Sequence, residues 1–173
     1  DEAATDAAFA NAAKVIEQDF AFPFLAHATM EPMNAVVQVK DGRATIWTGA
    51  QMPTIDQAVA AKILGLTPEK IDVVTLYAGG SFGRRAVPNS DYVAEAAEVA
   101  KAWGRPEPVK MVWRREDDMK AGYYRPAYLH RVKVGLDGDG NILAWKHTIV
   151  GQSILAGTPF AAMVKNGVDA TSV

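Results

Sequence analysis

Cysteine is absent from the 173-residue chain, and this absence excludes several kinds of site at once. Without thiols the chain forms no disulfide, binds no metal through thiolate and carries no iron–sulfur cluster of its own. The absence leaves the compartment open, because a domain without cysteine survives equally well in oxidising and reducing environments.

The chain also lacks a long apolar run and an excess of charge of either sign. No segment is long and apolar enough to span a bilayer or to form the apolar region of a signal peptide. The formal net charge is −2, which argues against nucleic acid or an anionic membrane as the main partner. Hydrophobic residues make up 49% of the chain, enough for a core, and the length suits a single domain, residues 1–173.

Periodicity and turn signals predict an α+β fold of mixed or antiparallel hairpins with two main helices. The alanine-rich start, residues 1–13, is a short helix or a frayed terminus. Helices and hairpins do not alternate in a regular β-α-β order, which disfavours a doubly wound sheet. The main helices are expected at 53–64 and 90–103, and strands at 14–24, 33–39, 44–48, 71–77, 109–113, 128–136 and 142–150.

The register of the last hairpin, 128–136 with 142–150, follows from its apolar faces and its turn. A two-residue turn at Gly138-Asp139 places residue 136 opposite 141, and His130 opposite His147. Facing histidines suggest a metal site, but zinc usually takes three or four protein ligands and no third candidate is near in sequence. We therefore expect the two histidines to help cover a core face.

The segment Gly79 to Arg85, with the sequence Gly-Gly-Ser-Phe-Gly-Arg-Arg, is the most informative in the chain. Its glycines make a loop whose amides can approach a ligand closely, because no Cβ blocks them. Arg84 and Arg85 add fixed positive charge suited to phosphate oxygens. The loop therefore suggests a phosphorylated cofactor, and the alternative is a tight surface turn with two solvated arginines.

Two familiar phosphate-binding loops do not match this segment. A Walker loop ends in Gly-Lys-Ser or Gly-Lys-Thr, which Arg84 and Arg85 do not supply. The dinucleotide fingerprint needs a third glycine at the position of Arg85.

Charged residues outside this loop allow two readings. His27 and Glu31 lie between apolar runs, where a carboxylate of raised pKa can orient or protonate a substrate. The alternative is a histidine–glutamate pair that satisfies itself within a buried turn. The run 114–118 (Arg-Arg-Glu-Asp-Asp) predicts a solvated, self-compensating loop.

Taken in order, several segments resemble the molybdenum-binding large subunit of the xanthine dehydrogenase/aldehyde oxidase family. The resemblance is strongest to the beta subunit of isoquinoline 1-oxidoreductase and related bacterial aldehyde dehydrogenases, and it covers about residues 14–150. The matching stretches are 23–32, 47–51, 79–85, 104–106 with 109–110, and 114–119.

The resemblance implies that the glycine loop binds a molybdopterin cofactor, which bacterial members usually carry as molybdopterin cytosine dinucleotide. No protein side chain would bind the molybdenum directly. Phe82 would also shape the substrate pocket, with His27 and Glu31 as further candidates. The implied cofactor-binding residues are Gly79, Gly80, Ser81, Phe82, Gly83 and Arg84.

The implied reaction is hydroxylation of an N-heterocyclic aromatic compound or an aldehyde, with water as the oxygen source. The expected partners are the small-molecule substrate, the rest of the large subunit, and a small iron–sulfur subunit or electron-acceptor protein that holds 2Fe–2S clusters. Relatives of this branch often carry a twin-arginine export signal, so a periplasmic location is favoured over a cytoplasmic one.

Three departures from the family pattern limit what the resemblance implies. Ser81 stands at the usual third glycine of the loop, and Leu25 stands where the xanthine dehydrogenase branch has a glutamine. The family's catalytic glutamate lies in a downstream Gly-x-Gly-Glu motif that this sequence does not contain. We therefore expect a fragment of a larger subunit, without a catalytic residue and inactive alone. The alternative is a non-catalytic scaffold or assembly module that keeps the fold and has lost the cofactor.

Overall fold

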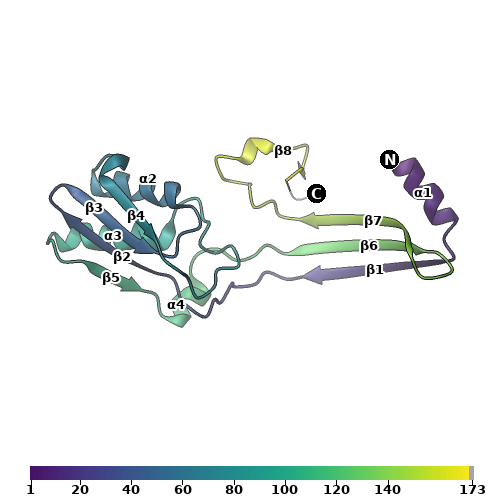
Figure 1. Cartoon of the computed structure of the whole chain (residues 1–173), viewed down its shortest axis with the longest axis horizontal. Helices are drawn as coiled ribbons and strands as arrows, with labels where there is room; N and C mark the ends of the chain where they lie inside the picture. The colour runs from purple at the N-terminus through teal and green to yellow at the C-terminus, as the bar shows by residue number, and fades with distance from the viewer. Residues whose placement is uncertain (172–173) are drawn as a thin grey trace. The chain divides into compact units, whose positions relative to one another are not determined.

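The computed structural model describes residues 1–171, which belong to two compact units (Figure 1). One unit is Ala26–Tyr124, and the other combines Asp1–Leu25 with the residues from Arg125 onward. No helix in the described residues is long and apolar enough to cross a bilayer. The helices are α1 (Glu2–Ala10), α2 (Pro53–Leu64), α3 (Asp91–Trp103) and α4 (Arg115–Lys120). The strands are β1 (Lys14–Phe22), β2 (Asn34–Lys40), β3 (Arg43–Thr48), β4 (Ile71–Thr75), β5 (Val109–Val112), β6 (Tyr128–Leu136), β7 (Ile142–Gly151), β8 (Val164–Lys165) and β9 (Val168–Asp169).

This element order confirms the predicted α+β fold with its two main helices. The assignment of residues 1–173 to a single domain stays a prediction.

The unit Ala26–Tyr124 is a four-stranded sheet, in the order β4-β3-β2-β5, packed against α2 and α3. The hairpin of β2 and β3 forms as predicted, because Asp41 and Gly42 both take positive φ (51° and 71°), as a tight hairpin turn requires. Strands β3 and β4 are parallel, and α2 makes the crossover between them. Alternate strand residues such as Ala35, Val37 and Ile46 are fully buried under the helices.

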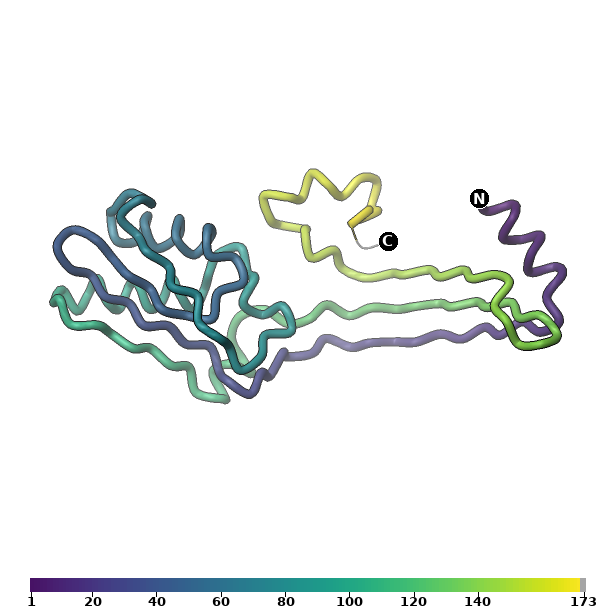
Figure 2. The backbone as a smooth tube through the Cα atoms, in the orientation of Figure 1, coloured from purple at the N-terminus to yellow at the C-terminus, as the bar shows by residue number. Residues whose placement is uncertain are grey.

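The other unit is built on an antiparallel sheet in the order β1-β6-β7. Figure 2 shows β1 and β6, far apart in sequence, running side by side. Val134 lies opposite Trp145, which confirms that the apolar residues of the two hairpin strands share one face. The predicted register is wrong by two residues, since His130 pairs with Ile149 and His147 with Val132.

The turn of this hairpin explains the difference in register. The carboxylate of Asp137 accepts hydrogen bonds from the backbone N–H groups of Asp139 and Asn141, at 2.9 and 2.8 Å, which closes a longer turn than predicted. The pairing shifts by one residue between Gly135 and Leu136, as at a β-bulge. A longer turn and a bulge together displace the ladder while keeping the same residues on the same face.

The two histidines of this hairpin meet diagonally across the sheet. His130 Nδ1 and His147 Nε2 are 2.8 Å apart. His147 is exposed, so the prediction that these side chains cover a core is wrong: no helix or sheet in residues 1–171 buries them. The described residues contain no group of three histidine, aspartate or glutamate side chains placed to bind a metal ion.

Candidate cofactor-binding site

The glycine loop, residues 79–83, lies at the carboxyl end of the parallel pair of strands β3 and β4. The N–H of Leu76 donates to the carbonyl of Thr48 at 2.9 Å and keeps the two strand ends together. Gln51 follows β3 and contacts the loop. Ligands of sheets with parallel strands bind outside the carboxyl ends of those strands. The topology therefore places the loop where a ligand site is expected.

Four consecutive backbone N–H groups of the loop, from Gly80 to Gly83, have no acceptor in the described part of the chain. Gly80, Phe82 and Gly83 take positive φ of 101°, 53° and 92°. For a non-glycine residue such as Phe82 this conformation costs about 1–2 kcal/mol, and strain of this kind concentrates at functional sites. Consecutive N–H groups in a turn form a concavity that suits an anionic ligand. Phe82 as a whole residue is 71% exposed beside them.

Glu31 forms hydrogen bonds with Gly79 at the start of the loop. Its carboxylate Oε2 accepts the N–H of Gly79 at 2.5 Å, and its own N–H donates to the carbonyl of Gly79 at 3.1 Å. The side-chain amide of Asn34 donates to Glu31 Oε1 at 2.6 Å. A Cβ at Gly79 would lie 2.6 Å from the Cβ of Glu31, so only glycine fits at this position.

These bonds decide the protonation of Glu31. The hydrogen bond from Asn34, followed by the Gly79 N–H and the charges of Arg85 and Lys110, lowers the pKa of Glu31 below its ordinary value. The alternative in which Glu31 has a raised pKa is therefore wrong, because the donors outweigh desolvation of a side chain that is 34% exposed. Glu31 holds the loop as a carboxylate. Its place in the substrate pocket, and that of His27, stay predictions.

Arg85 is 2% exposed, and its side chain holds the backbone of the loop through hydrogen bonds. Its Nε donates to the carbonyl of Gly80 at 3.3 Å, and its Nη2 lies 3.5 Å from Glu31 Oε1. The backbone N–H of Arg85 donates to Gln51 Oε1 at 3.1 Å, and the hydroxyl of Ser81 donates to the same oxygen. Ser81 therefore ties the loop to Gln51, a contact that a third glycine would not provide.

Arg84 is also 2% exposed, so the alternative of two solvated arginines is wrong. Its guanidinium forms a two-pronged salt bridge with Asp91 in the first turn of α3, with distances of 3.2 and 2.6 Å. The ring of Trp113 lies 5.5 Å from the guanidinium carbon. Arg84 therefore has a structural partner, and its contact with a cofactor phosphate stays a prediction.

The segment 114–118 was expected to be a solvated loop and instead begins helix α4. Salt bridges at i and i+3, such as Arg115 to Asp118 at 2.9 Å, stabilise this short helix. Asp118 is buried, and Arg115 donates to the carbonyls of Thr29 and Met30, the latter at 3.1 Å. The helix thus anchors the segment that carries Glu31.

Residues 1–168 match the sequence model of the molybdopterin cofactor-binding domain. The chain belongs to this family. It is 43% identical over 131 residues to isoquinoline 1-oxidoreductase subunit beta of Brevundimonas diminuta, a match that covers 75% of this chain and 16% of that protein. It is 34% identical over 159 residues to the aldehyde oxidoreductase molybdenum-binding subunit PaoC of Escherichia coli (strain K12), covering 91% of this chain and 21% of that protein.

Solved structures agree with this assignment. The aldehyde oxidoreductase from Desulfovibrio gigas superposes with a TM-score of 0.64 and 26% identity, covering 85% of this chain and 16% of that one. The CO dehydrogenase from Oligotropha carboxidovorans gives 0.63 and 28%, covering 86% and 18%. This molybdopterin cofactor-binding domain thus spans 16% to 21% of the length of these curated relatives, and the family predicted from the motifs is confirmed.

Gln51, like Asn34, contacts the site of the molybdopterin cofactor-binding domain and was not singled out from the sequence. Its segment, 47–51, matched the family, but nothing in the residue type marked it as a loop contact. The available signal was its position just beyond strand β3, the neighbour of the strand that leads into the glycine loop.

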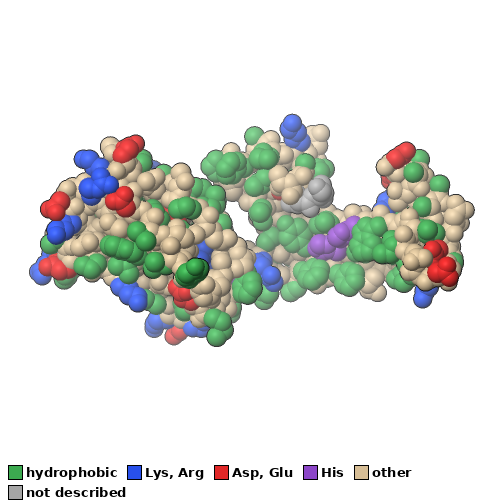
Figure 3. Space-filling view, in the orientation of Figure 1, with side chains coloured by type: hydrophobic (Ala, Val, Ile, Leu, Met, Phe, Trp, Pro, Cys, Tyr) green, Lys and Arg blue, Asp and Glu red, His purple; other side chains and the backbone are tan. Residues whose placement is uncertain are grey.

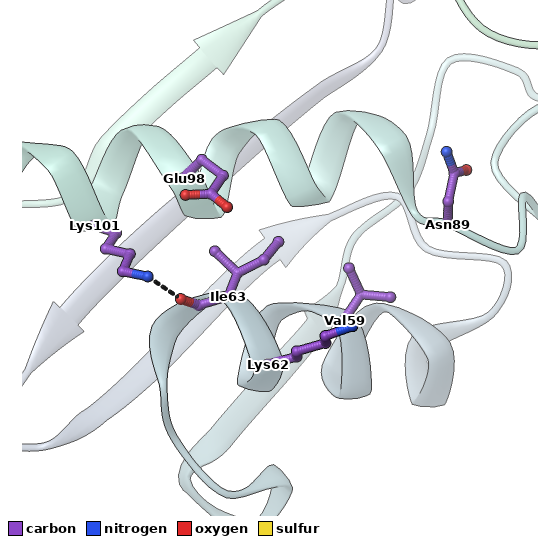
Figure 4. A pocket seen from close by; sticks show the side chains of 6 residues that line it. All are labelled: Val59, Lys62, Ile63, Asn89, Glu98 and Lys101. Carbon is purple, nitrogen blue, oxygen red and sulfur yellow. Dashed lines mark hydrogen bonds between the residues drawn. The ribbon is translucent and has the colours of Figure 1, made fainter.

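An open groove between α2 and α3 is separate from this site (Figure 4). Lys101 Nζ donates to the carbonyl of Ile63 across the groove at 2.7 Å, so the groove lies at the junction of the two helices. None of its lining residues belongs to the glycine loop. The lining residues are Val59, Lys62, Ile63, Asn89, Glu98 and Lys101.

Glutamine at position 31 is expected to weaken this domain in a pH-dependent way. Because the folded state lowers the pKa of Glu31, the carboxylate stabilises the fold above the unfolded pKa, about 4.3, and this contribution is lost as the pH falls through the folded pKa. Glu31→Gln should therefore lower the melting temperature at pH 7, and the difference should shrink as the pH falls below the unfolded pKa and close below the folded pKa. Thermal unfolding from pH 3 to pH 7 measures it.

Glu107→Gln, at an exposed position, is the matched control and should show no such difference. A deficit of Glu31→Gln that stays constant across the pH range would contradict the role of the ionised carboxylate.

Proposed function

We propose that this chain holds the cofactor of a molybdenum hydroxylase that oxidises N-heterocyclic aromatic compounds or aldehydes with water as the oxygen source. The row of four unused N–H groups at the carboxyl end of β3 and β4 carries this proposal. The names of the relatives, an isoquinoline oxidoreductase subunit and an aldehyde oxidoreductase subunit, support these substrate classes.

The residues of the loop fit a molybdopterin group. The N–H groups of Gly80, Ser81, Phe82 and Gly83 would donate to its electronegative atoms, and the cofactor would supply two-electron redox chemistry at this position. Glu31 and Arg85 keep those N–H groups in place before the cofactor binds, so little ordering is required on binding. The exposed ring of Phe82 offers an apolar surface to a planar substrate.

The form of the cofactor, the path of the electrons and the location of the protein are further parts of this proposal. We infer that the cofactor is the cytosine dinucleotide form and that electrons leave through 2Fe–2S clusters on a partner, since this chain has no cysteine to hold them. We also propose that the chain is part of a longer subunit, the parent subunit, which supplies the catalytic glutamate. A periplasmic location is part of the proposal, and fractionation of cells with an antibody to the parent subunit tests it.

The origin of the product oxygen tests the proposed reaction. The parent subunit, purified with its native partner, is incubated in isotopically labelled water with N-heterocycles or aldehydes and an artificial electron acceptor. We expect each hydroxylated product to carry oxygen from water. Product oxygen from O₂, or no turnover by a preparation that contains stoichiometric molybdenum, would contradict the proposal.

A further inference from the structure

The sheet β1-β6-β7 has two faces of opposite character. Side chains alternate along each strand, and directly opposed residues share a face, so the register assigns every side chain to one face. The apolar face, as we call it, carries no lysine, arginine, aspartate or glutamate between positions 16 and 22, 128 and 134, or 145 and 149. It consists of Ile16, Gln18, Phe20, Phe22, Tyr128, His130, Val132, Val134, Trp145, His147 and Ile149.

The second face carries the charged residues, and helix α1 packs on part of it. Asp19 and Arg131, directly opposed, form a salt bridge at 2.8 Å. Helix α1 lies on this face, where Lys146 pairs with Glu2 at 2.9 Å. The ring of Phe9 from the same helix packs close to Gly135. These contacts pair charged side chains of this face within the unit, while Val15, Leu129 and Val150 on the same face remain 45%, 45% and 61% exposed.

No element in residues 1–171 gives the apolar face a comparable cover. Ile16, Phe20, Phe22 and Trp145 remain 44%, 46%, 53% and 54% exposed. Figure 3 shows hydrophobic side chains gathered along these strands with histidine among them. A contiguous apolar surface of this kind marks an interface.

We propose that the apolar face is the docking surface for further polypeptide of the parent subunit, an inference that rests on the proposed function. The relatives carry roughly four-fifths or more of their length outside the matched region, so the same chain supplies ample polypeptide. A surface without permanent charge suits a permanent, core-like interface, whereas separable partners meet through more polar surfaces. The paired imidazoles of His130 and His147 are its main polar feature, and their hydrogen bond lets them enter an apolar contact.

The absence of cysteine provides a direct test. Gln18 and Glu17 are adjacent on β1, both exposed, and point to opposite faces. Gln18→Cys and Glu17→Cys are made separately in the full-length parent subunit, and their reaction with a maleimide is followed by mass spectrometry of the β1 peptide. We expect cysteine 18 to react at least about 100-fold more slowly than cysteine 17 in the native protein, and at the same rate in denaturant.

Each other outcome overturns the inference. Equal, fast reaction at the two positions would show that the apolar face is not covered, and equal protection of both would show that the apolar face is no more an interface than the charged face. Protection that disappears when the partner subunit is removed would assign the face to that partner, and protection lost on dilution would assign it to a second copy. Molybdenum content, measured on the same preparations, reports on the proposed function separately.

Discussion

Alanine at position 79 is expected to reduce the molybdenum content of the parent subunit to less than a tenth of the wild-type value. The added Cβ would lie 2.6 Å from the Cβ of Glu31. The two carbon atoms can move apart only if the two hydrogen bonds between residues 79 and 31 break. Overpacking of this kind costs about 1–3 kcal/mol, and here it falls on the contact that fixes the loop. Metal analysis of purified Gly79→Ala protein measures the effect.

Gly138→Ala is the matched control, because no atom lies within 4 Å of the added Cβ and its φ is ordinary. That variant should keep its molybdenum. Full molybdenum occupancy in the Gly79→Ala protein would contradict the claim that the hydrogen bonds between Glu31 and Gly79 hold the loop in position for the cofactor.

Methionine at position 84 is expected to destabilise α3 by about 3 kcal/mol, whether or not the cofactor is bound. The Arg84 side chain is 2% exposed and its partner Asp91 is 16% exposed, so removing the cation leaves a largely buried carboxylate unpaired. Native-state hydrogen exchange of the α3 amides measures the local free energy of opening. Adding Asp91→Asn should recover part of the loss, because the unpaired charge is then removed.

The exposed pair of Arg43 and Asp72 provides the control for this prediction. These side chains are 53% and 58% exposed, so Arg43→Met should cost less than about 1 kcal/mol. If Arg84→Met loses stability only in the cofactor-loaded protein, Arg84 is a phosphate ligand and its structural role is refuted.

Local signals in the sequence predicted most of the fold. The turn at Asp41 and Gly42 gave the hairpin of β2 and β3, and Gly65 and Gly104 take left-handed φ at the ends of α2 and α3, as expected of helix-ending glycines. The register of β6 and β7 was not predictable in the same way, because it depends on side-chain hydrogen bonds of Asp137 and on a bulge.

The candidate site was located from the sequence, but the roles of its charged residues were not. Two arginines after a glycine loop look alike in sequence whether they bind phosphate or support the loop. Their burial depends on Asp91 and on Glu31, which is 54 residues from Arg85 along the chain, and only the tertiary fold brings these groups together. For the same reason the sequence left two alternatives open for Glu31, since its donors Asn34 and Gly79 were not known to converge on it and lower its pKa.

Molybdenum and acid-released cytidine monophosphate, quantified on the full-length parent subunit purified with its native partner, test the central claim most directly. The proposed role of the glycine loop predicts stoichiometric amounts of both. Protein that contains neither, from a host that loads a known relative, would contradict the claim and leave a scaffold that has kept the fold without the cofactor.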